Sequence, residues 1–247
     1  IHAFRPRQSI NYVACHDGMT MYDLTAYNTA NNWANGHDNQ DGPIEYRWNC
    51  GWEGEENLPA NVLKFRKQQI KNYFTILMLS NGTPMFRMGD EFLQTQHGNN
   101  NPFNQDNEMS WLDWARRDEH VDIFRFVKML IAFRKSHPSI SRSRFWRDDI
   151  HWFGTNHDAD LSESSKAIAW CIHGSSQQDN DLYVMLNGHQ EAITFGIHEG
   201  AAGDWQKVID TSLNSGDDIV LESVGKPVAE KSMVVNARSV VVLVRIK

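Results

Sequence analysis

Two short apolar runs each end in residues that could do chemistry. The run 10–15 is followed by His16-Asp17-Gly18, and the run 84–88 by Gly89-Asp90-Glu91. A carboxylate beside an imidazole can bind a polyhydroxylated ligand, because the carboxylate accepts hydrogen bonds from two hydroxyls and the imidazole adds another. The same His-Asp pair could instead only fix the shape of a loop. The spacing alone leaves both interpretations open.

Other reactive chemistries find little support in the residues. The sequence contains no Gly-x-Ser-x-Gly elbow, no HExxH motif and no glycine-rich phosphate motif. Asp158, Asp160 and Ser162 resemble the start of a calcium loop, but Glu163 stands where that loop requires glycine. The three cysteines lie far apart and form no CxxC pair, which disfavours a disulfide framework or a structural zinc site. We therefore expect no metal and no cofactor.

Composition limits the partners. Lys plus Arg is 24 and Asp plus Glu is 31, which gives a net charge of −7 and disfavours nucleic-acid binding. No apolar run approaches the ~18–20 residues that span a bilayer, so no membrane partner is expected. The few, scattered cysteines favour a reducing compartment, and we expect a cytoplasmic protein.

Aromatic residues are unusually frequent, at 11% of the chain. Several tryptophans fall in segments rich in Asn, Gly, Asp and Glu, namely Trp33, Trp48, Trp52, Trp111 and Trp114. Aromatic faces beside amides and carboxylates suit sugars, because the ring stacks on the apolar face and the polar groups bind hydroxyls. Alternatively, these side chains only pin long loops to a core. For the set as a whole, neither interpretation is preferred.

The elements that position these residues alternate between strands and helices. The expected order is a strand over 10–15, a polar loop over 18–60, a helix of about 20 residues from Pro59, a strand over 84–88, a loop over 90–119 and a helix over 120–135. Such alternation predicts a parallel sheet, in which function gathers in the loops that follow the strands.

After residue 138 the pattern changes to short β-rich runs separated by turns. These runs are 150–153, 167–172, 182–186, 192–197, 208–209, 232–235 and 239–246. They predict an antiparallel β-sandwich, with a domain boundary near residue 137 and hence domains 1–137 and 138–247. Two parallel strands cannot form an independent sheet, and a (β/α)8 barrel needs roughly 250 residues. We therefore expect 1–137 to be the tail of a larger α/β domain, and the chain to be a piece of a longer protein.

The segment Ser9-Ile10-Asn11-Tyr12-Val13-Ala14-Cys15-His16-Asp17-Gly18 resembles the fourth conserved region of the alpha-amylase superfamily of glycoside hydrolases. More narrowly, the chain is similar to the isoamylase and bacterial glycogen-debranching (GlgX-type) branch. The matching segments are Arg47–Gly51 with Glu53-Gly54, Gly82–Met85 with Gly89–Phe92, Gly98–Asn101 with Gln105–Glu108, and Ser110–Trp114.

This resemblance implies a retaining hydrolase that cleaves α-1,6 branch points in glycogen or related α-glucans. The fold would be α/β plus all-β: the last two strand–helix units of a (β/α)8 TIM barrel, then an antiparallel β-sandwich. Asp17 maps to the carboxylate that stabilises the transition state, and His16 to a substrate-binding histidine. The debranching signature adds Asn104, Gln105 and Asp106 as substrate-binding candidates. Asp90 and Glu91 follow the eighth strand and are not the reacting pair.

The family's nucleophile Asp and acid/base Glu have no counterpart in this sequence, so the chain alone is expected to be inactive. Its expected partners are a branched α-glucan and the missing N-terminal part of the same enzyme. Two alternatives remain: a related transglycosylase or branching enzyme, and a non-catalytic carbohydrate-binding module. Exposed coplanar aromatics on the sandwich would mark the module, but we expect Trp152, Trp170 and Trp205 to lie mostly in the core.

Overall fold

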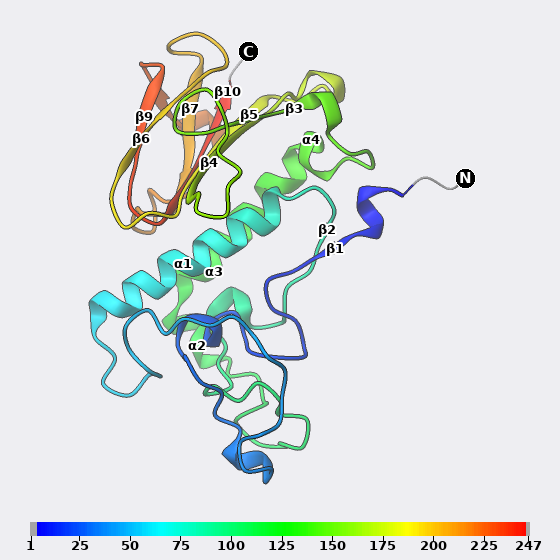
Figure 1. Cartoon of the computed structure of the whole chain (residues 1–247), viewed down its shortest axis with the longest axis vertical. Helices are drawn as coiled ribbons and strands as arrows, with labels where there is room; N and C mark the ends of the chain where they lie inside the picture. Colours follow the sequence, from blue (N-terminus) through cyan, green and yellow to red (C-terminus); the bar gives the residue numbers. More distant parts are fainter. Residues whose placement is uncertain (1–3, 246–247) are drawn as a thin grey trace. The chain divides into compact units, whose positions relative to one another are not determined.

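The computed structural model describes residues 4–245 (Figure 1), which divide into two compact units. The first, here called the loop unit, contains Ile10–Leu77 and Pro84–Val127. The second, the sheet unit, contains residues 4–9, Met78–Thr83 and residues 128–245. The domain boundary near residue 137 stays a prediction.

The loop unit contains residues 60–77 of one helix and residues 121–127 of another, and the sequence predicts both helices. Helix α1 spans Ala60–Leu79 and helix α3 spans Val121–Ser136, and the short helix α2 (Ala115–Glu119) precedes α3. Apolar side chains at helical spacing are buried, with Ile70 and Phe74 fully inaccessible on α1. Lys67 on α1 donates to Asp122 on α3 at 2.9 Å. This ion pair joins the parts of α1 and α3 that lie in the loop unit.

Strands β1 (Ile10–Asn11) and β2 (Thr83–Pro84) are much shorter than the expected strands over 10–15 and 84–88. They pair with each other in a two-stranded sheet. The N–H of Met85 still donates to the Asn11 carbonyl at 2.8 Å. Among the described residues no further strand extends this pair, so the backbone beyond it turns into loops. The expected strand lengths were wrong for this reason.

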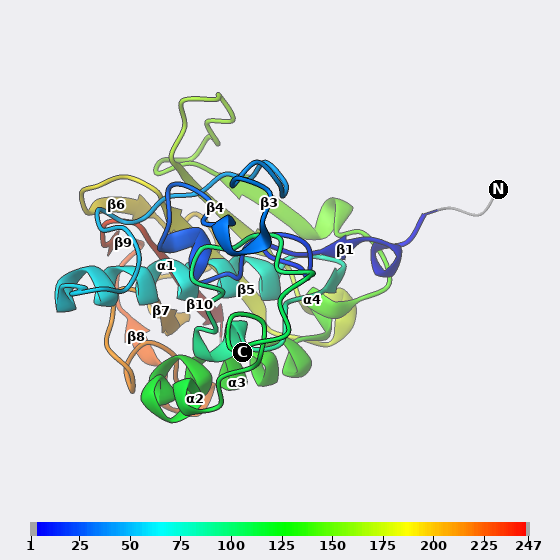
Figure 2. The same ribbon diagram turned by 90° about the horizontal axis from the view of Figure 1, so that it is seen from below.

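The sheet unit contains a six-stranded antiparallel sheet in the order β3-β4-β5-β10-β7-β8. Its strands are β3 (Ile150–Phe153), β4 (Ala167–Ile172), β5 (Asp181–Asn187), β7 (Trp205–Asp210), β8 (Lys226–Val228) and β10 (Ser239–Arg245). Strands β6 (Ile193–Gly196) and β9 (Ser232–Val235) form a second, two-stranded antiparallel sheet, and the two strands lie side by side in both views (Figures 1 and 2). The short helix α4 (Pro138–Ser141) precedes the sheets.

Side chains from both sheets share one core, which includes Tyr183 and Leu243 from the larger sheet and Phe195 and Val235 from the smaller one. An antiparallel C-terminal β-domain, as predicted from the turn-separated runs, is therefore confirmed. The described part of β10 is buried on both faces, because Val240 to Val244 are at most 1% accessible. Its predicted last residue, Ile246, lies outside the described residues.

Candidate functional site

His16 and Asp17 border an open cavity of about 560 Å³ in the loop unit. The other lining residues are Gly18, Gly42, Pro43, Arg87, Gln96, Asn100, Asn101, Pro102 and Phe103. The side chains of His16 and Asp17 are 87% and 83% exposed, and His16 Nε2 lies 3.4 Å from Asp17 Oδ2. Both side chains are thus open to a ligand, and the cavity lining supplies further amide and guanidinium groups.

The chain turns sharply immediately after Asp17. Gly18 has φ +107°, and a Cβ at this position would lie 2.3 Å from Glu45 Oε1, so only glycine fits without strain. The Glu45 carboxylate accepts the N–H of Met19 at 3.0 Å and the side-chain amide of Asn100 at 2.9 Å. Glu45 therefore ties the turn that presents Asp17 to the loop that forms another wall.

Asparagines connect the two long loops. Asn32 Nδ2 donates to Asn100 Oδ1 at 2.8 Å, and the Asn100 N–H donates to Asn32 Oδ1 at 3.0 Å. Asp41 Oδ2 accepts from both Asn35 and Asn101 at 2.8 Å. Buried amides that satisfy one another in this way rigidify loops that lack regular secondary structure.

A buried arginine of α1 holds the first long loop. Arg66 is inaccessible to solvent, and its Nη1 donates to the Gly54 carbonyl at 2.8 Å and to the Tyr22 hydroxyl at 3.2 Å. Its Nη2 donates to the carbonyls of Trp52 and, at 3.2 Å, Asn49. One guanidinium thus ties several carbonyls of the irregular loop to α1, although the Asn49 carbonyl also accepts the Trp52 N–H at 3.2 Å.

Asp90 is buried in the loop unit, and its carboxylate accepts hydrogen bonds from two backbone N–H groups. Its two carboxylate oxygens accept the N–H groups of Met21 at 2.9 Å and Arg87 at 3.0 Å. Burial raises the pKa of Asp90 to about 7, against the opposing effect of these hydrogen bonds. The neighbouring Glu91 accepts the Gly89 N–H at 2.8 Å. Neither side chain is among the residues that line the cavity.

Arg87 is a lining residue that the sequence argument did not select. Its Nη1 is buried without a hydrogen-bond partner among residues 4–245. Burial lowers its pKa, although the nearby charge of Asp90 opposes the shift. A guanidinium beside the cavity suits an oxygen-rich ligand, although this Nη1 atom is itself shielded from solvent. In the sequence Arg87 stands between the apolar residues Phe86 and Met88, and this pattern does not indicate a residue that lines a cavity.

The residues Asn104, Gln105 and Asp106 are not brought into the lining. Asn104 Nδ2 donates to the Asn35 carbonyl at 3.0 Å, and Gln105 Nε2 to the Ala34 carbonyl at 2.9 Å. Asp106 accepts the indole N–H of Trp111 at 3.0 Å. These three side chains shape the loop behind the cavity wall, and a role for them in binding substrate stays a proposal.

The aromatic side chains divide between the two interpretations. Trp33, Trp111 and Trp114 are 56–65% exposed, as a stacking surface requires. Trp52 instead donates its indole N–H to the Glu56 carbonyl at 3.0 Å, which fixes a loop. Phe103, which lines the cavity, is 73% exposed and offers a ring face there.

Comparison with known proteins connects this geometry to a family. Residues 149–244 match the family model described as the C-terminal domain of isoamylase. "Isoamylase 3, chloroplastic" from rice is 39% identical over 230 residues, which cover 89% of this chain and 28% of that protein. The "Glycogen operon protein GlgX homolog" of Mycobacterium tuberculosis is 34% identical over 240 residues, or 86% of this chain and 33% of that protein. The chain belongs to the isoamylase family.

This isoamylase-family chain spans about a third or less of the length of these two relatives. Solved structures of pullulanases share its fold. Type I pullulanase from Bacillus subtilis aligns over 98% of this chain and 28% of its own, with a TM-score of 0.69 and 20% identity. Pullulanase from Anoxybacillus, complexed with maltotetraose, covers 99% of this chain with a TM-score of 0.68 and 22% identity. Across residues 4–245 no helix is long and apolar enough to cross a membrane.

Proposed function

We propose that this chain is part of a retaining glycoside hydrolase that cleaves α-1,6 branch linkages in glycogen or related α-glucans. The observation that carries the proposal is the exposed Asp17 carboxylate beside His16 at the edge of an open cavity, in a chain of the isoamylase family. The cavity lining is largely polar, with Arg87, Gln96 and Asn100 among its residues, which suits a ligand rich in hydroxyls.

Asp17 would act on the sugar without reacting covalently. In the retaining mechanism a separate pair of carboxylates, ~5–5.5 Å apart, performs the double displacement. Asp17 would accept hydrogen bonds from ring hydroxyls, and its negative charge would favour the oxocarbenium-like transition state over the ground state. His16, 3.4 Å away, would bind an adjacent hydroxyl. Both roles require side chains that are free to meet the substrate.

The proposal extends to the rest of the protein. This sequence holds no counterpart of the family's nucleophile Asp or acid/base Glu, so the chain alone should be inactive. We propose that the loop unit completes a (β/α)8 barrel with an N-terminal part of the same enzyme, which would supply both groups. The cytoplasmic location expected from the sequence stays a prediction, because the relatives include proteins named as chloroplastic.

The alternatives have less support. A binding module would present coplanar exposed aromatics, but Trp205 is 1% exposed and Trp170 8%. Trp152 is 48% exposed, and its ring is tilted by 40° from that of Trp170. The strongest alternative is a transglycosylase, because such an enzyme would use Asp17 in the same way.

Product analysis on glycogen limit dextrin tests the proposal. The whole protein should release reducing ends and remove branches, whereas the 247-residue chain, freed of host amylases, should release none. Chain transfer without a net gain of reducing ends would assign the protein to the transglycosylases. Release of reducing sugar by the chain alone would contradict the proposed division of catalytic groups.

A further inference from the structure

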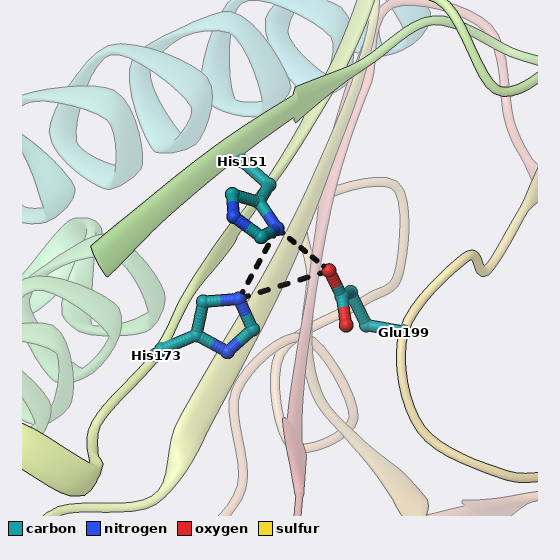
Figure 3. Close-up of side chains that lie close together, drawn as sticks. All are labelled: His151, His173 and Glu199. Atoms are coloured by element: carbon teal, nitrogen blue, oxygen red, sulfur yellow. Dashed lines mark hydrogen bonds and ion pairs between the residues drawn. The ribbon is translucent and has the colours of Figure 1, made fainter. Parts of the chain in front are cut away.

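We propose that the sheet unit contains a binding site for a divalent transition-metal ion such as Zn²⁺, formed by His151, His173 and Glu199. Figure 3 shows the three side chains pointing toward one another. His151 lies on β3, His173 follows β4 directly, and Glu199 lies in the loop after β6. None of the three lines the cavity beside Asp17.

The strand register places the two imidazoles together. His151 pairs with Cys171 across β3 and β4, and two residues further along the N–H of His173 donates to the Asp149 carbonyl at 2.8 Å. Side chains two apart on a strand share a face, so His151 and His173 project from the same side of the sheet. Strand β3 and the residue directly after β4 therefore hold both ligands on paired backbone.

The carboxylate comes from the opposite layer of the domain and is also held. Ile197, two residues before Glu199, is buried in the core that the two sheets share. The indole N–H of Trp205 donates to the Glu199 carbonyl at 2.9 Å. This anchors the backbone from which the Glu199 carboxylate reaches the two histidines, at the end of the core.

The three ligand atoms have the spacing that a metal requires. His151 Nδ1 lies 2.8 Å from Glu199 Oε1 and 3.4 Å from His173 Nε2, and the third edge is 3.7 Å. Tetrahedral zinc with bonds of ~2.0–2.1 Å sets its ligand atoms about 3.3 Å apart, which is the mean of these edges. The point equidistant from the three atoms lies about 1.9 Å from each, so an ion just off their plane reaches all three.

Hydrogen bonds do not by themselves require all three ligand atoms to converge. If the Nδ1–H of His151 donates to Glu199, that nitrogen has no lone pair left for His173. If His173 carries its proton on Nε2, that N–H then has no acceptor in the cluster, because the Glu199 oxygen lies 3.7 Å away, beyond hydrogen-bond range. If the proton is on Nδ1 instead, Nε2 keeps a lone pair that can bind a cation or accept from water. A cation between the three atoms would accept a lone pair from each and bring His173 Nε2 into the same interaction as the other two.

Charge and exposure also suit an ion with an open coordination position. With neutral imidazoles the three ligands carry a single negative charge, which a divalent ion outweighs. The side chain of His151 is 54% exposed and those of His173 and Glu199 about 25%, so water can complete the coordination. Two imidazoles and one carboxylate favour Zn²⁺, Co²⁺ or Ni²⁺ over Ca²⁺ and Mg²⁺, which prefer oxygen ligands.

Calorimetry of the full chain, without a histidine tag and after dialysis against chelator, tests the proposal. Titration with ZnCl₂ should show one saturable site with a Kd below about 10 µM, whereas MgCl₂ and CaCl₂ should give no saturable binding. His173→Gln and Glu199→Gln should each weaken Zn²⁺ binding by about 100-fold or more. His189→Gln, which alters an exposed histidine of the same unit, is the matched control and should bind like the wild type.

Cobalt gives a second, independent readout. Co²⁺ bound to the wild-type chain should show the intense visible absorption of a tetrahedral site, and Zn²⁺ should displace it. Circular dichroism checks that each variant is folded. If His173→Gln does not fold, Glu199→Gln still tests the site, because it leaves both histidines in place. No saturable Zn²⁺ binding by the wild-type chain, or equal affinity in His189→Gln and Glu199→Gln, would overturn the proposal and leave only a hydrogen-bonded cluster.

Discussion

Replacing Arg66 with methionine should loosen the loop that carries one wall of the cavity. Methionine fills a similar volume but cannot donate, so the carbonyls of Trp52 and Gly54 lose the donor supplied by the inaccessible Arg66 side chain, and that of Asn49 keeps only the Trp52 N–H. The guanidinium is the shared donor for these groups. Its loss should therefore affect the whole segment at once.

The structure sets the size of the effect. Each charged hydrogen bond contributes roughly 1.5–3 kcal/mol, but Arg66 gives up its hydration on burial, so the bonds do not simply add. Removing one partner from a buried charged network typically costs ~3–5 kcal/mol, and we expect ~3–4 kcal/mol here. Arg66→Lys keeps the charge but not the forked geometry, and should lose about half as much.

Urea unfolding and amide hydrogen exchange together measure this effect. The N–H of Trp48 donates to Leu24 and that of Gly54 to Ala26, so these two amides report on the loop directly. Both should exchange faster in Arg66→Met. The exposed Lys64→Met on the same helix is the control and should stay within about 0.5 kcal/mol of wild type. Unchanged protection of both amides, with a normal unfolding midpoint, would refute the reasoning.

Two further predictions concern pH and domain folding. The pKa of Asp90 is about 7 in the folded state against an ordinary aspartate value of 3.8, so the folded state takes up the proton first. Its contribution to stability should therefore rise as the pH falls from 7 to 4, by up to ~1.4 kcal/mol per pH unit. Urea unfolding of wild type and Asp90→Asn across this range should show their difference changing, and a pH-independent difference would count against it. Residues 138–247 should fold alone and give dispersed amide spectra, whereas an isolated 1–137 polypeptide should not.

The sequence predicts those elements whose pattern is local. The bounds of β3, β4 and β9 agree with the predicted runs, because turn residues border each of them. Strand β8 was missed, since Lys226–Val228 is short and contains a proline, which an edge strand tolerates. The strands over 10–15 and 84–88 were predicted too long, because strand length depends on neighbours that apolar runs do not reveal.

For the candidate sites too, the sequence reveals residues in local motifs and misses those whose roles depend on distant contacts. His16 and Asp17 were identified because they follow an apolar run and match a family motif. Glu45 was missed, since its role arises from a contact with Met19, 26 residues away. His151 and Glu199 are 48 residues apart, and only the sheet register and the shared core bring them together. Contacts of this kind have no spacing signature in the sequence.

The kinetics of Asp17→Asn in the whole protein test the central claim most directly. Asparagine keeps the shape of the side chain but not the charge, so kcat on a branched α-glucan should fall by on the order of 10²–10³, with KM within about tenfold and an unchanged melting temperature. Asp118→Asn is the matched control, because that carboxylate is also 83% exposed in the loop unit, and it should retain wild-type kcat. An unchanged kcat together with a lower melting temperature would show that Asp17 only fixes its loop, and would contradict the account.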